Sequence, residues 1–342
     1  MSKNYYIIPI FVPHEGCPHN CVFCNQDRIT GASDDVTALT VRNTINEYLE
    51  TIQNKSATIE VSFFGGTFTG IREEKQRELL EVAKEFKDKQ LIDKIRLSTR
   101  PDYINEYILT YLKEYGVNII ELGVQSLDEE VLKKAGRGHS IQDVINASKL
   151  IKNYEFVLGH QIMPGLPGDT FEKDISTTKA SLKMEPEICR IYPALVIKDT
   201  PMEKMYKCKE YVPYSLEEAV NVSKVMYNMY RKSNINVIRI GLQPTESINE
   251  GADIVAGPFH PSFRELVEGS LLADIISENI HDKKEAQIHI NPKDLSKLYA
   301  NRKLYFNKLK ENNKLIEVEQ DDKIERGHIK LCLKDKKLDI IY

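Results

Sequence analysis

Residues 5–24 read YYIIPIFVPHEGCPHNCVFC, a short apolar run that is followed at once by three closely spaced cysteines. The apolar run at 5–11 is rich in aromatic and β-branched residues and therefore predicts a strand. Cys17, Cys21 and Cys24 follow it in the pattern C-x3-C-x2-C. In a (β/α) barrel, the loops that follow the strands carry the catalytic residues. This stretch therefore predicts the first strand of the fold and a reactive loop directly after it.

Further apolar runs alternate with helix-type segments along the first 245 residues. Strands are predicted at 58–64, 94–100, 119–126, 156–165, 188–197 and 237–244. Helices are predicted at 36–53, 73–89, 105–115, 170–183 and 215–233. Strands joined by helices of this length form parallel sheets, and six or more such units indicate a complete or partial barrel. The expected fold class is α/β, with a partial (β/α)6-type barrel.

The alternation of helices and strands stops near residue 245. We expect a core barrel over 1–245 and a small C-terminal α/β extension over 246–342, which could take part in substrate binding. The extension offers strands at 287–290, 315–319, 328–333 and 338–342, with a lysine-rich helix at 293–311. Its last 62 residues are locally basic, although the whole chain has a net charge of −4. A solvated helix face explains these lysines most simply, and an RNA-facing surface is the alternative.

The composition argues against a membrane or secreted protein. No apolar run approaches the ~20 residues that are needed to span a bilayer. The first residues lack the small-residue cleavage site of a signal peptide. We therefore expect a cytoplasmic protein without a membrane partner. In that compartment, closely spaced cysteines more often bind a metal or take part in catalysis than form disulfides.

Three thiolates on one loop suit a [4Fe-4S] cluster that has one iron without a protein ligand. A cubane cluster normally takes four thiolates, so a three-cysteine loop leaves one coordination position open. Structural zinc is an alternative in which His14 or His19 supplies a fourth ligand, but no second ligand pair follows in the chain. An electron-transfer cluster completed by Cys189 or Cys208 is another alternative, and a chance grouping is the last.

The cysteine motif, with the aromatic Phe23 before its last cysteine, resembles the signature of the radical S-adenosylmethionine (SAM) superfamily. The resemblance implies that Cys17, Cys21 and Cys24 hold a [4Fe-4S] cluster that binds SAM. One electron then cleaves SAM to methionine and a 5′-deoxyadenosyl radical, which abstracts hydrogen from a substrate. It also implies an electron donor, either a reductase or a flavodoxin or ferredoxin.

The resemblance also implies contacts to the adenine of SAM. Phe23 matches the aromatic residue that lies near the base. The stretch 161–168, which includes Gln161 and Gly165, matches a segment that runs along the adenine through backbone contacts.

Gly65, Gly66 and Thr67 match the turn that meets the amino group of SAM. Paired glycines let backbone carbonyls approach a ligand closely, which agrees with this role. An ordinary strand-to-helix turn is the alternative interpretation of these three residues.

Four further residues match contacts to the ribose or carboxylate of SAM. Ser98 and Arg100 end the third predicted strand, where the family contacts either group. Gln125 matches a polar contact to the ribose. Arg137 could pair with the carboxylate through its planar guanidinium, and a surface arginine is the alternative.

A closer resemblance rests on several motifs that occur in the same order. They are STRPDYI (98–104), ELGVQS (121–126), GRGHS (136–140), GHQIMPGLPGD (159–169) and RIYPALVIKDT (190–200). Together they resemble the radical SAM part of the catalytic subunit of Elongator and its relatives, which modify uridine at the wobble position of tRNA. This resemblance covers roughly residues 5–245 and implies that tRNA is the substrate.

Two departures separate this sequence from those enzymes. Its first two cysteines are closer together, and no acetyl-CoA loop of the Q/R-x-x-G-x-G/A type follows residue 245. The resemblance therefore does not carry an acetyltransferase domain or its reaction. Two other hypotheses stay open: a radical SAM enzyme acting on a small molecule, as in anaerobic porphyrin oxidation, and a non-catalytic iron–sulfur RNA-binding protein.

Residues at the carboxyl ends of barrel strands are expected to face the substrate. The catalytic or substrate-facing candidates are His160, Tyr192, Lys198 and Arg239, with Gln243 and His260 nearby. A lysine, an arginine and a tyrosine around one cavity would suit an anionic or nucleotide substrate.

Overall fold

The structure is a computed structural model that covers most of the chain. It describes residues 4–12, 19, 21–25, 36–244, 248–249, 251–280, 283, 285–311, 315–334 and 336–342. Two of the three cysteines in the motif lie in the described part, whereas Cys17 lies outside it.

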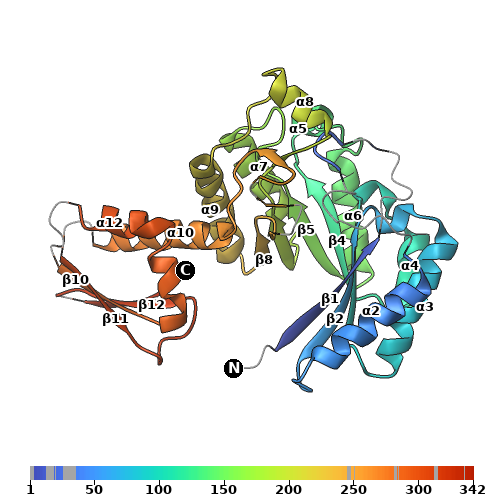
Figure 1. The fold of residues 1–342 in the computed structure, drawn as a ribbon, viewed down its shortest axis with the longest axis horizontal. Helices are drawn as coiled ribbons and strands as arrows, with labels where there is room; N and C mark the ends of the chain where they lie inside the picture. The colour runs from blue at the N-terminus through green and yellow to red at the C-terminus, as the bar shows by residue number, and fades with distance from the viewer. Residues whose placement is uncertain are drawn as a thin grey trace.

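A curved sheet of seven parallel strands forms the centre of the protein (Figure 1). In spatial order its strands are β1 (Tyr5–Val12), β2 (Thr58–Gly65), β3 (Lys94–Thr99), β4 (Ile119–Gln125), β5 (Val157–Ile162), β6 (Ile188–Ile191) and β8 (Asn236–Ile240). Because β1 and β8 are the two edges of this sheet, the barrel is partial. The structure thus confirms the expected α/β class and partial barrel.

Helices cover the outer face of the sheet and connect its strands (Figure 1). They are α2 (Ala38–Thr51), α3 (Glu73–Asp88), α4 (Glu106–Glu114), α6 (Ile141–Asn153), α7 (Phe171–Leu182) and α9 (Leu216–Lys232). Two short helices, α5 (Glu129–Lys134) and α8 (Pro201–Lys207), lie instead beyond the ends of the strands, at the top of Figure 1. Two 3-10 turns are η1 (Phe68–Gly70) and η2 (Pro101–Tyr103). Capping boxes at Ser140 and Ser215 satisfy free amides at the starts of α6 and α9. The helices pack against buried strand residues such as Leu97 and Ile120, each of which contributes about 1.5–3 kcal/mol of hydrophobic stabilisation.

The predicted strand at 188–197 is wrong as one element. The chain forms β6 and then a separate short strand, β7 (Val196–Ile197), which pairs antiparallel with β9 (Ile254–Ala256). The amide of Tyr192 still donates to the carbonyl of Ile162 over 2.8 Å. Pro193 follows and has no amide to continue the ladder, which is why the sheet ends there.

Within the C-terminal extension, α10 (Phe263–Asn279) packs against α9 and precedes a second sheet. The second sheet has four strands in the order β11-β10-β12-β13, and Figure 1 shows it below α10, to the left of the barrel. The strands are β10 (Glu285–Ile290), β11 (Leu315–Gln320), β12 (His328–Cys332) and β13 (Lys337–Ile341), which confirms the four predicted strands. A second hydrophobic cluster begins at Leu272 within α10. The domain boundary at 245/246 stays a prediction.

The predicted continuous helix over 293–311 is wrong. The chain instead forms η3 (Pro292–Asp294), α11 (Leu295–Leu298), η4 (Asn301–Lys303) and α12 (Leu304–Leu309). Asn301, Arg302 and Lys303 all have positive φ values, which a right-handed helix does not accept. In the described part of the chain, none of the helices combines the length and the apolar character that crossing a bilayer would require.

Candidate functional site

Two cysteines of the motif lie on one tight turn next to α5 and α8. The amide of Cys24 donates to the carbonyl of Cys21 over 3.0 Å, and this bond closes the turn. Val22 anchors the turn because its amide bonds to Ala135 and its carbonyl accepts from Met202. Cys21 is buried, whereas Cys24 is partly exposed. Among the described residues, which do not include Cys17, no group of three or more His, Cys, Asp or Glu residues could hold a metal.

Two arginines direct their guanidinium groups toward the sulfur of Cys21. Arg137 Nη1 lies 3.4 Å from Cys21 Sγ, and Arg100 Nη1 lies 4.0 Å from the same atom. Asp102 fixes Arg100 through two bonds of 2.9 and 2.8 Å, and Arg100 also donates to the backbone carbonyl of Arg137. The pair therefore places two fixed positive charges beside a buried thiol, which suits an anionic sulfur ligand.

A polar corner lies next to this thiol at the carboxyl end of β4. Arg137 Nη2 donates to the carbonyl of Gly123 over 2.5 Å. A Cβ atom on Gly123 would lie 3.1 Å from Gln125 Nε2 and 3.3 Å from Arg137 Nη2, so only glycine leaves this corner open. Gln125 Oε1 and Arg137 Nε are buried and have no hydrogen-bond partner among the described residues.

These two buried atoms test whether SAM fits the corner. A buried polar atom without a partner costs about 1–3 kcal/mol, and a ligand that bonds to both atoms would recover this cost. Gln125 supplies an acceptor, and Arg137 supplies a donor with a positive charge. A ligand that carries both a hydroxyl and a carboxylate fits this donor set, and SAM carries both. The cysteine turn likewise fits an iron–sulfur cluster, because thiolates are its usual ligands.

The Gly65-Gly66-Thr67 turn has a reason within the fold itself. Gly65 has φ +109° and pairs with Val12, and a Cβ atom on it would lie 2.2 Å from the Val12 carbonyl oxygen. The amide of Gly66 donates to that same oxygen over 3.3 Å. Thr67 is buried at the start of η1. Close pairing of β1 with β2 thus demands the first glycine, whatever ligand the turn meets.

A row of charged residues crosses the inner face of the sheet. Glu121 on β4 accepts from Arg190 Nε at 2.6 Å and also pairs with Arg96. Arg96 reaches Glu60 on β2, with Nη2 2.8 Å from Oε2. All four side chains are buried. None of these four residues was predicted from the sequence, although Glu60, Glu121 and Arg190 are each the single charge of an apolar strand, a pattern that could have revealed them.

Two predicted cofactor contacts join this row. Gln161 Nε2 donates to Glu121 Oε2 over 2.8 Å and to Ser98 Oγ over 3.2 Å. Gly159, two residues before Gln161, faces the same side, because a Cβ atom there would lie 2.7 Å from Glu121 Cγ. Ser98 and Gln161 therefore lie on the inner face together.

His160 does not face the site, and its assignment as a substrate-facing residue is wrong. Side chains alternate along a strand, so His160 points opposite to Gln161, toward the outer helices. Its ring is fully buried, with Nε2 3.0 Å from Ser148 Oγ on α6 and Nδ1 2.8 Å from Ser181 Oγ on α7. Burial lowers the pKa of this imidazole to about 3, so it is neutral at physiological pH.

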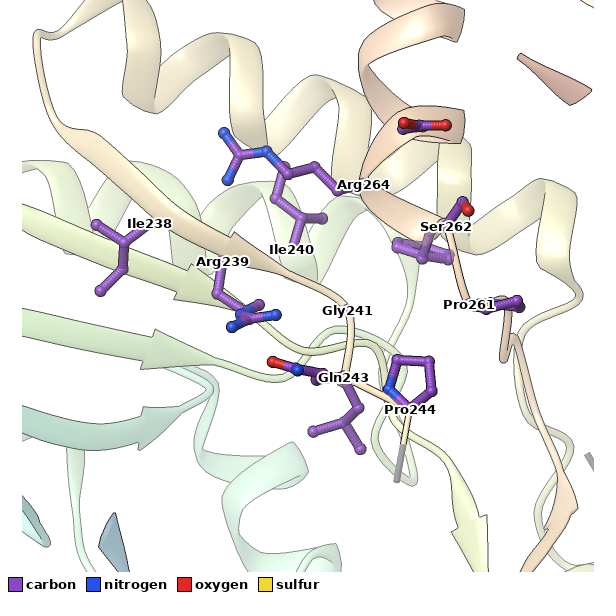
Figure 2. Close-up of a pocket in the computed structure, with 12 residues that line it drawn as sticks. Ile238, Arg239, Ile240, Gly241, Gln243, Pro244, Pro261, Ser262 and Arg264 are labelled. Atoms are coloured by element: carbon purple, nitrogen blue, oxygen red, sulfur yellow. The ribbon is translucent and has the colours of Figure 1, made fainter. Parts of the chain in front are cut away.

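The other substrate-facing candidates lie in different places. Lys198 follows β7, is about half exposed and lies 3.8 Å from Asp253. Tyr192 accepts a bond of 3.1 Å from Arg190 Nη1 at the end of the charged row. Arg239 lies one residue before the end of β8 and lines a hollow of about 300 Å³ (Figure 2). Lys198 is not among the residues that line that hollow, so the predicted grouping of the lysine with the arginine in one cavity is not seen there.

The remaining predicted residues lie in loops around the carboxyl edge. Phe23 packs against apolar residues of α5 and the loop around Leu166. Gly165 has φ +83°, and its carbonyl accepts a 2.6 Å bond from Tyr211. His260 accepts a bond from the amide of Ser262 just before α10. Gln243 lies beside Arg239 in the hollow (Figure 2).

Two histidines lie near the cysteine turn: His139, which was not predicted as a site residue, and His19, which was named only as an alternative zinc ligand. His139 is buried, and burial followed by the nearby Arg137 and Arg100 charges lowers its pKa to about 3. His19 packs against Gly138, where a Cβ atom would lie 2.4 Å from the imidazole. Gly138, with φ +75°, is therefore what allows the cysteine loop to approach α5.

Comparison with known families gives two matches along the chain. A sequence model of the radical SAM superfamily matches residues 11–178, and a model described as the radical SAM C-terminal domain matches residues 186–272. The first match contains the cysteine turn, both arginines and the polar corner of β4. The second contains β6, β8 and most of α10.

Similar proteins include the tRNA uridine(34) acetyltransferase of Methanocaldococcus infernus, which is 29% identical over 255 residues. That alignment covers 63% of this chain and 48% of the relative, so the chain spans about half the length of this protein. Elongator complex protein 3 of Saccharomyces cerevisiae is 32% identical over 131 residues, covering 37% of this chain and 24% of that one.

Among solved structures, the archaeal Methanocaldococcus infernus Elp3 with residues 1–46 deleted superposes with a TM-score of 0.61 and 26% identity. The superposition covers 82% of this chain and 64% of that one. It therefore extends beyond the seven-stranded sheet into the C-terminal part of the chain.

Proposed function

Because the chain belongs to the radical SAM superfamily, whose cofactors are a [4Fe-4S] cluster and SAM, we propose that it cleaves SAM reductively to modify a tRNA nucleoside. The observation that carries this proposal is the buried Cys21 thiol facing two arginines beside the open corner of β4. A purely structural metal site would have no use for that corner.

Cys17, Cys21 and Cys24 are the proposed ligands of three irons, which leaves the fourth iron open to SAM. When bound and reduced, the cluster supplies the single electron that breaks a sulfur–carbon bond of SAM and so generates a carbon radical. That electron comes from a reductase, a flavodoxin or a ferredoxin in the cytoplasm. Arg100 and Arg137 hold positive charge beside the Cys21 sulfur and so balance the negative charge of a thiolate-bound cluster.

The polar corner provides the proposed binding groups for SAM. Arg137 Nε offers a charged donor to the carboxylate, and Gln125 Oε1 offers an acceptor to a ribose hydroxyl. We assign the Gly65-Gly66-Thr67 turn to the amino group, and Arg100, Ser98 and Gln161 to the edge of the same site.

The adenine is assigned to the space between Phe23 and the turn at 161–168. Tyr211 holds this turn in place by donating to the carbonyl of Gly165. Phe23 comes from the cysteine turn itself, so the turn that carries the cluster ligands would also bring an aromatic ring to the base.

The choice of tRNA as substrate is supported by the relatives. Several similar proteins are named for tRNA uridine(34) acetylation or for Elongator. Acetyl transfer is not part of this proposal, because the chain spans only about half of those proteins.

SAM cleavage is tested directly by product analysis. The purified protein is reconstituted anaerobically with iron and sulfide, reduced with dithionite and given SAM, and 5′-deoxyadenosine is quantified by mass spectrometry. We expect product from the wild type and from Cys208→Ala, whose thiol is exposed at the end of α8. The Cys21→Ala variant should give only background. Equal product from the wild type and Cys21→Ala would refute the proposal.

The substrate is tested separately. Undermodified tRNA is incubated with the active enzyme, then digested to nucleosides and compared by mass spectrometry with a sample that lacks SAM. A new uridine derivative that depends on SAM supports the tRNA assignment. Robust 5′-deoxyadenosine formation with no change in any tRNA nucleoside would point to a small-molecule substrate.

A further inference from the structure

The charged row on the inner face of the sheet neutralises itself. Glu60 and Glu121 supply two carboxylates, and Arg96 and Arg190 supply two guanidinium groups, each bonded to a carboxylate. Buried charges are stable only when they are closely paired, and in this alternating order each guanidinium lies against at least one carboxylate. The four charges of the row therefore compensate one another on the inner face of the sheet, which leaves none of them available to bind a charged substrate.

Arg239 adds a third guanidinium on the next strand. It pairs in register with Arg190 across β6 and β8, and neighbours in register point to the same face of a sheet. In the described part of the chain, no acidic side chain lies within ion-pair distance of Arg239, and its guanidinium makes no hydrogen bond there. It is only partly exposed, so solvent does not fully hydrate it. A half-buried guanidinium without a counter-ion favours binding of an anion.

Two neutral donors accompany this arginine. The oxygen of Tyr192 accepts from Arg190, and its own hydroxyl hydrogen has no acceptor among the described residues. Burial raises the pKa of the Tyr192 phenol, so the hydrogen is retained at neutral pH. Gln243 lies beside Arg239 at the end of β8, and Figure 2 shows the two side chains on the same side of the chain.

The hollow at this position has room for a ligand group. It measures about 300 Å³ and lies between the end of β8 and the start of α10, at an open edge of the partial barrel. The second arginine of the hollow, Arg264, is already committed, because it bonds to Glu268 at 2.7 Å and to the carbonyl of Val237 at 3.0 Å. Arg239 is thus the arginine of this hollow that is available to a ligand.

We propose that Arg239, assisted by the Tyr192 hydroxyl and the Gln243 amide, binds a backbone phosphate of the RNA substrate and so positions the target nucleotide over the inner face of the sheet. This inference rests on the proposed function, because it assumes that the substrate is RNA. A guanidinium matches a phosphate through two parallel hydrogen bonds, and the two neutral donors supply further bonds to its oxygens. Each group is a donor, which suits an oxyanion better than a nucleobase edge.

The test measures tRNA binding by the reconstituted enzyme as a function of salt. Each phosphate contact contributes about −0.9 to the slope of log affinity against log salt for a duplex and about −0.7 for a single strand. We expect Arg239→Gln to weaken binding of an in vitro transcribed tRNA about tenfold or more at low salt, since a bond to a charged group is worth about 1.5–3 kcal/mol. The slope should become shallower by nearly one unit.

Two further variants sharpen the result. Arg264→Gln is the matched control, and it should keep the wild-type slope because that arginine is already paired. Arg239→Lys should keep the slope, because lysine retains the positive charge. It should lose part of the affinity, because an ammonium group cannot make the bidentate hydrogen bonds of a guanidinium. An unchanged slope in Arg239→Gln would overturn the proposal, and so would a wild-type enzyme that forms 5′-deoxyadenosine without binding tRNA.

A separate measurement distinguishes RNA from SAM as the anion. SAM binding is titrated calorimetrically in the absence of RNA for the wild type and Arg239→Gln. A large loss of SAM affinity would show that Arg239 faces the SAM carboxylate, which would overturn the phosphate assignment. Failure of the wild type to form any 5′-deoxyadenosine would instead count against the proposed function, and the tRNA-binding comparison would still test the role of Arg239.

Discussion

The buried His160 predicts a defined loss of stability in acid. In the unfolded chain a histidine titrates near 6.5, whereas burial lowers the pKa of His160 to about 3 in the fold. Between these two values the unfolded state binds a proton that the folded state does not bind. The free energy of unfolding therefore rises with pH across this window, and it falls as the solution is acidified below 6.5. A solution at pH 5.0 lies about 1.5 units below the pKa of the unfolded histidine. The protein should therefore be about 2 kcal/mol less stable at pH 5.0 than at pH 7.5.

The assay is urea unfolding followed by circular dichroism at pH 7.5 and pH 5.0. His160→Asn removes the titrating group, so the loss of stability between the two pH values should be about 2 kcal/mol smaller than in the wild type. Ser181→Ala is the control, because it removes a hydrogen bond to the ring but leaves the ring buried. That variant should lose about 1 kcal/mol at both pH values and keep the wild-type difference.

An equal pH difference in the wild type and His160→Asn would refute the reasoning. It would mean that the imidazole is protonated inside the fold, or that the unfolded chain does not expose it. A pH difference that disappears in Ser181→Ala would also contradict the argument, since burial rather than hydrogen bonding is the cause of the lowered pKa.

Two further predictions concern the row of charges and the glycine turn. Glu121→Gln should lower the free energy of unfolding by about 3–5 kcal/mol in chemical denaturation, because it leaves the buried Arg190 guanidinium without a counter-ion. The exposed Glu155→Gln should change it far less, and similar losses in both variants would contradict the prediction. Gly65→Ala should unfold at lower temperature than Gly251→Ala, since only the first places a Cβ atom against the Val12 carbonyl. Equal melting temperatures for these two variants would show that backbone conformation alone sets the cost.

The sequence by itself determined the class of fold and the chemistry of the cysteine loop. The alternation of strands with long helices is a local pattern, and connections of that length allow only parallel neighbours, so the partial barrel was predictable. Family membership was equally local, because the cysteine spacing and the ordered motifs can be read without knowing any contact between them. The four strands of the C-terminal sheet were also found from their short apolar runs.

Tertiary structure decided which side chains meet inside the sheet. His160 and Gln161 are neighbours in sequence, but they point to opposite faces of the sheet. His160 contacts the outer helices, whereas Gln161 contacts Glu121 on the inner face. Glu121 and Arg190 lie on strands 69 positions apart, so their pairing has no local signature. Likewise, Arg239 can be recognised as an unpaired charge only after the partners of the other arginines are known. The sequence therefore indicates how a radical would be generated, whereas the contacts across the sheet indicate where an anionic substrate would be held.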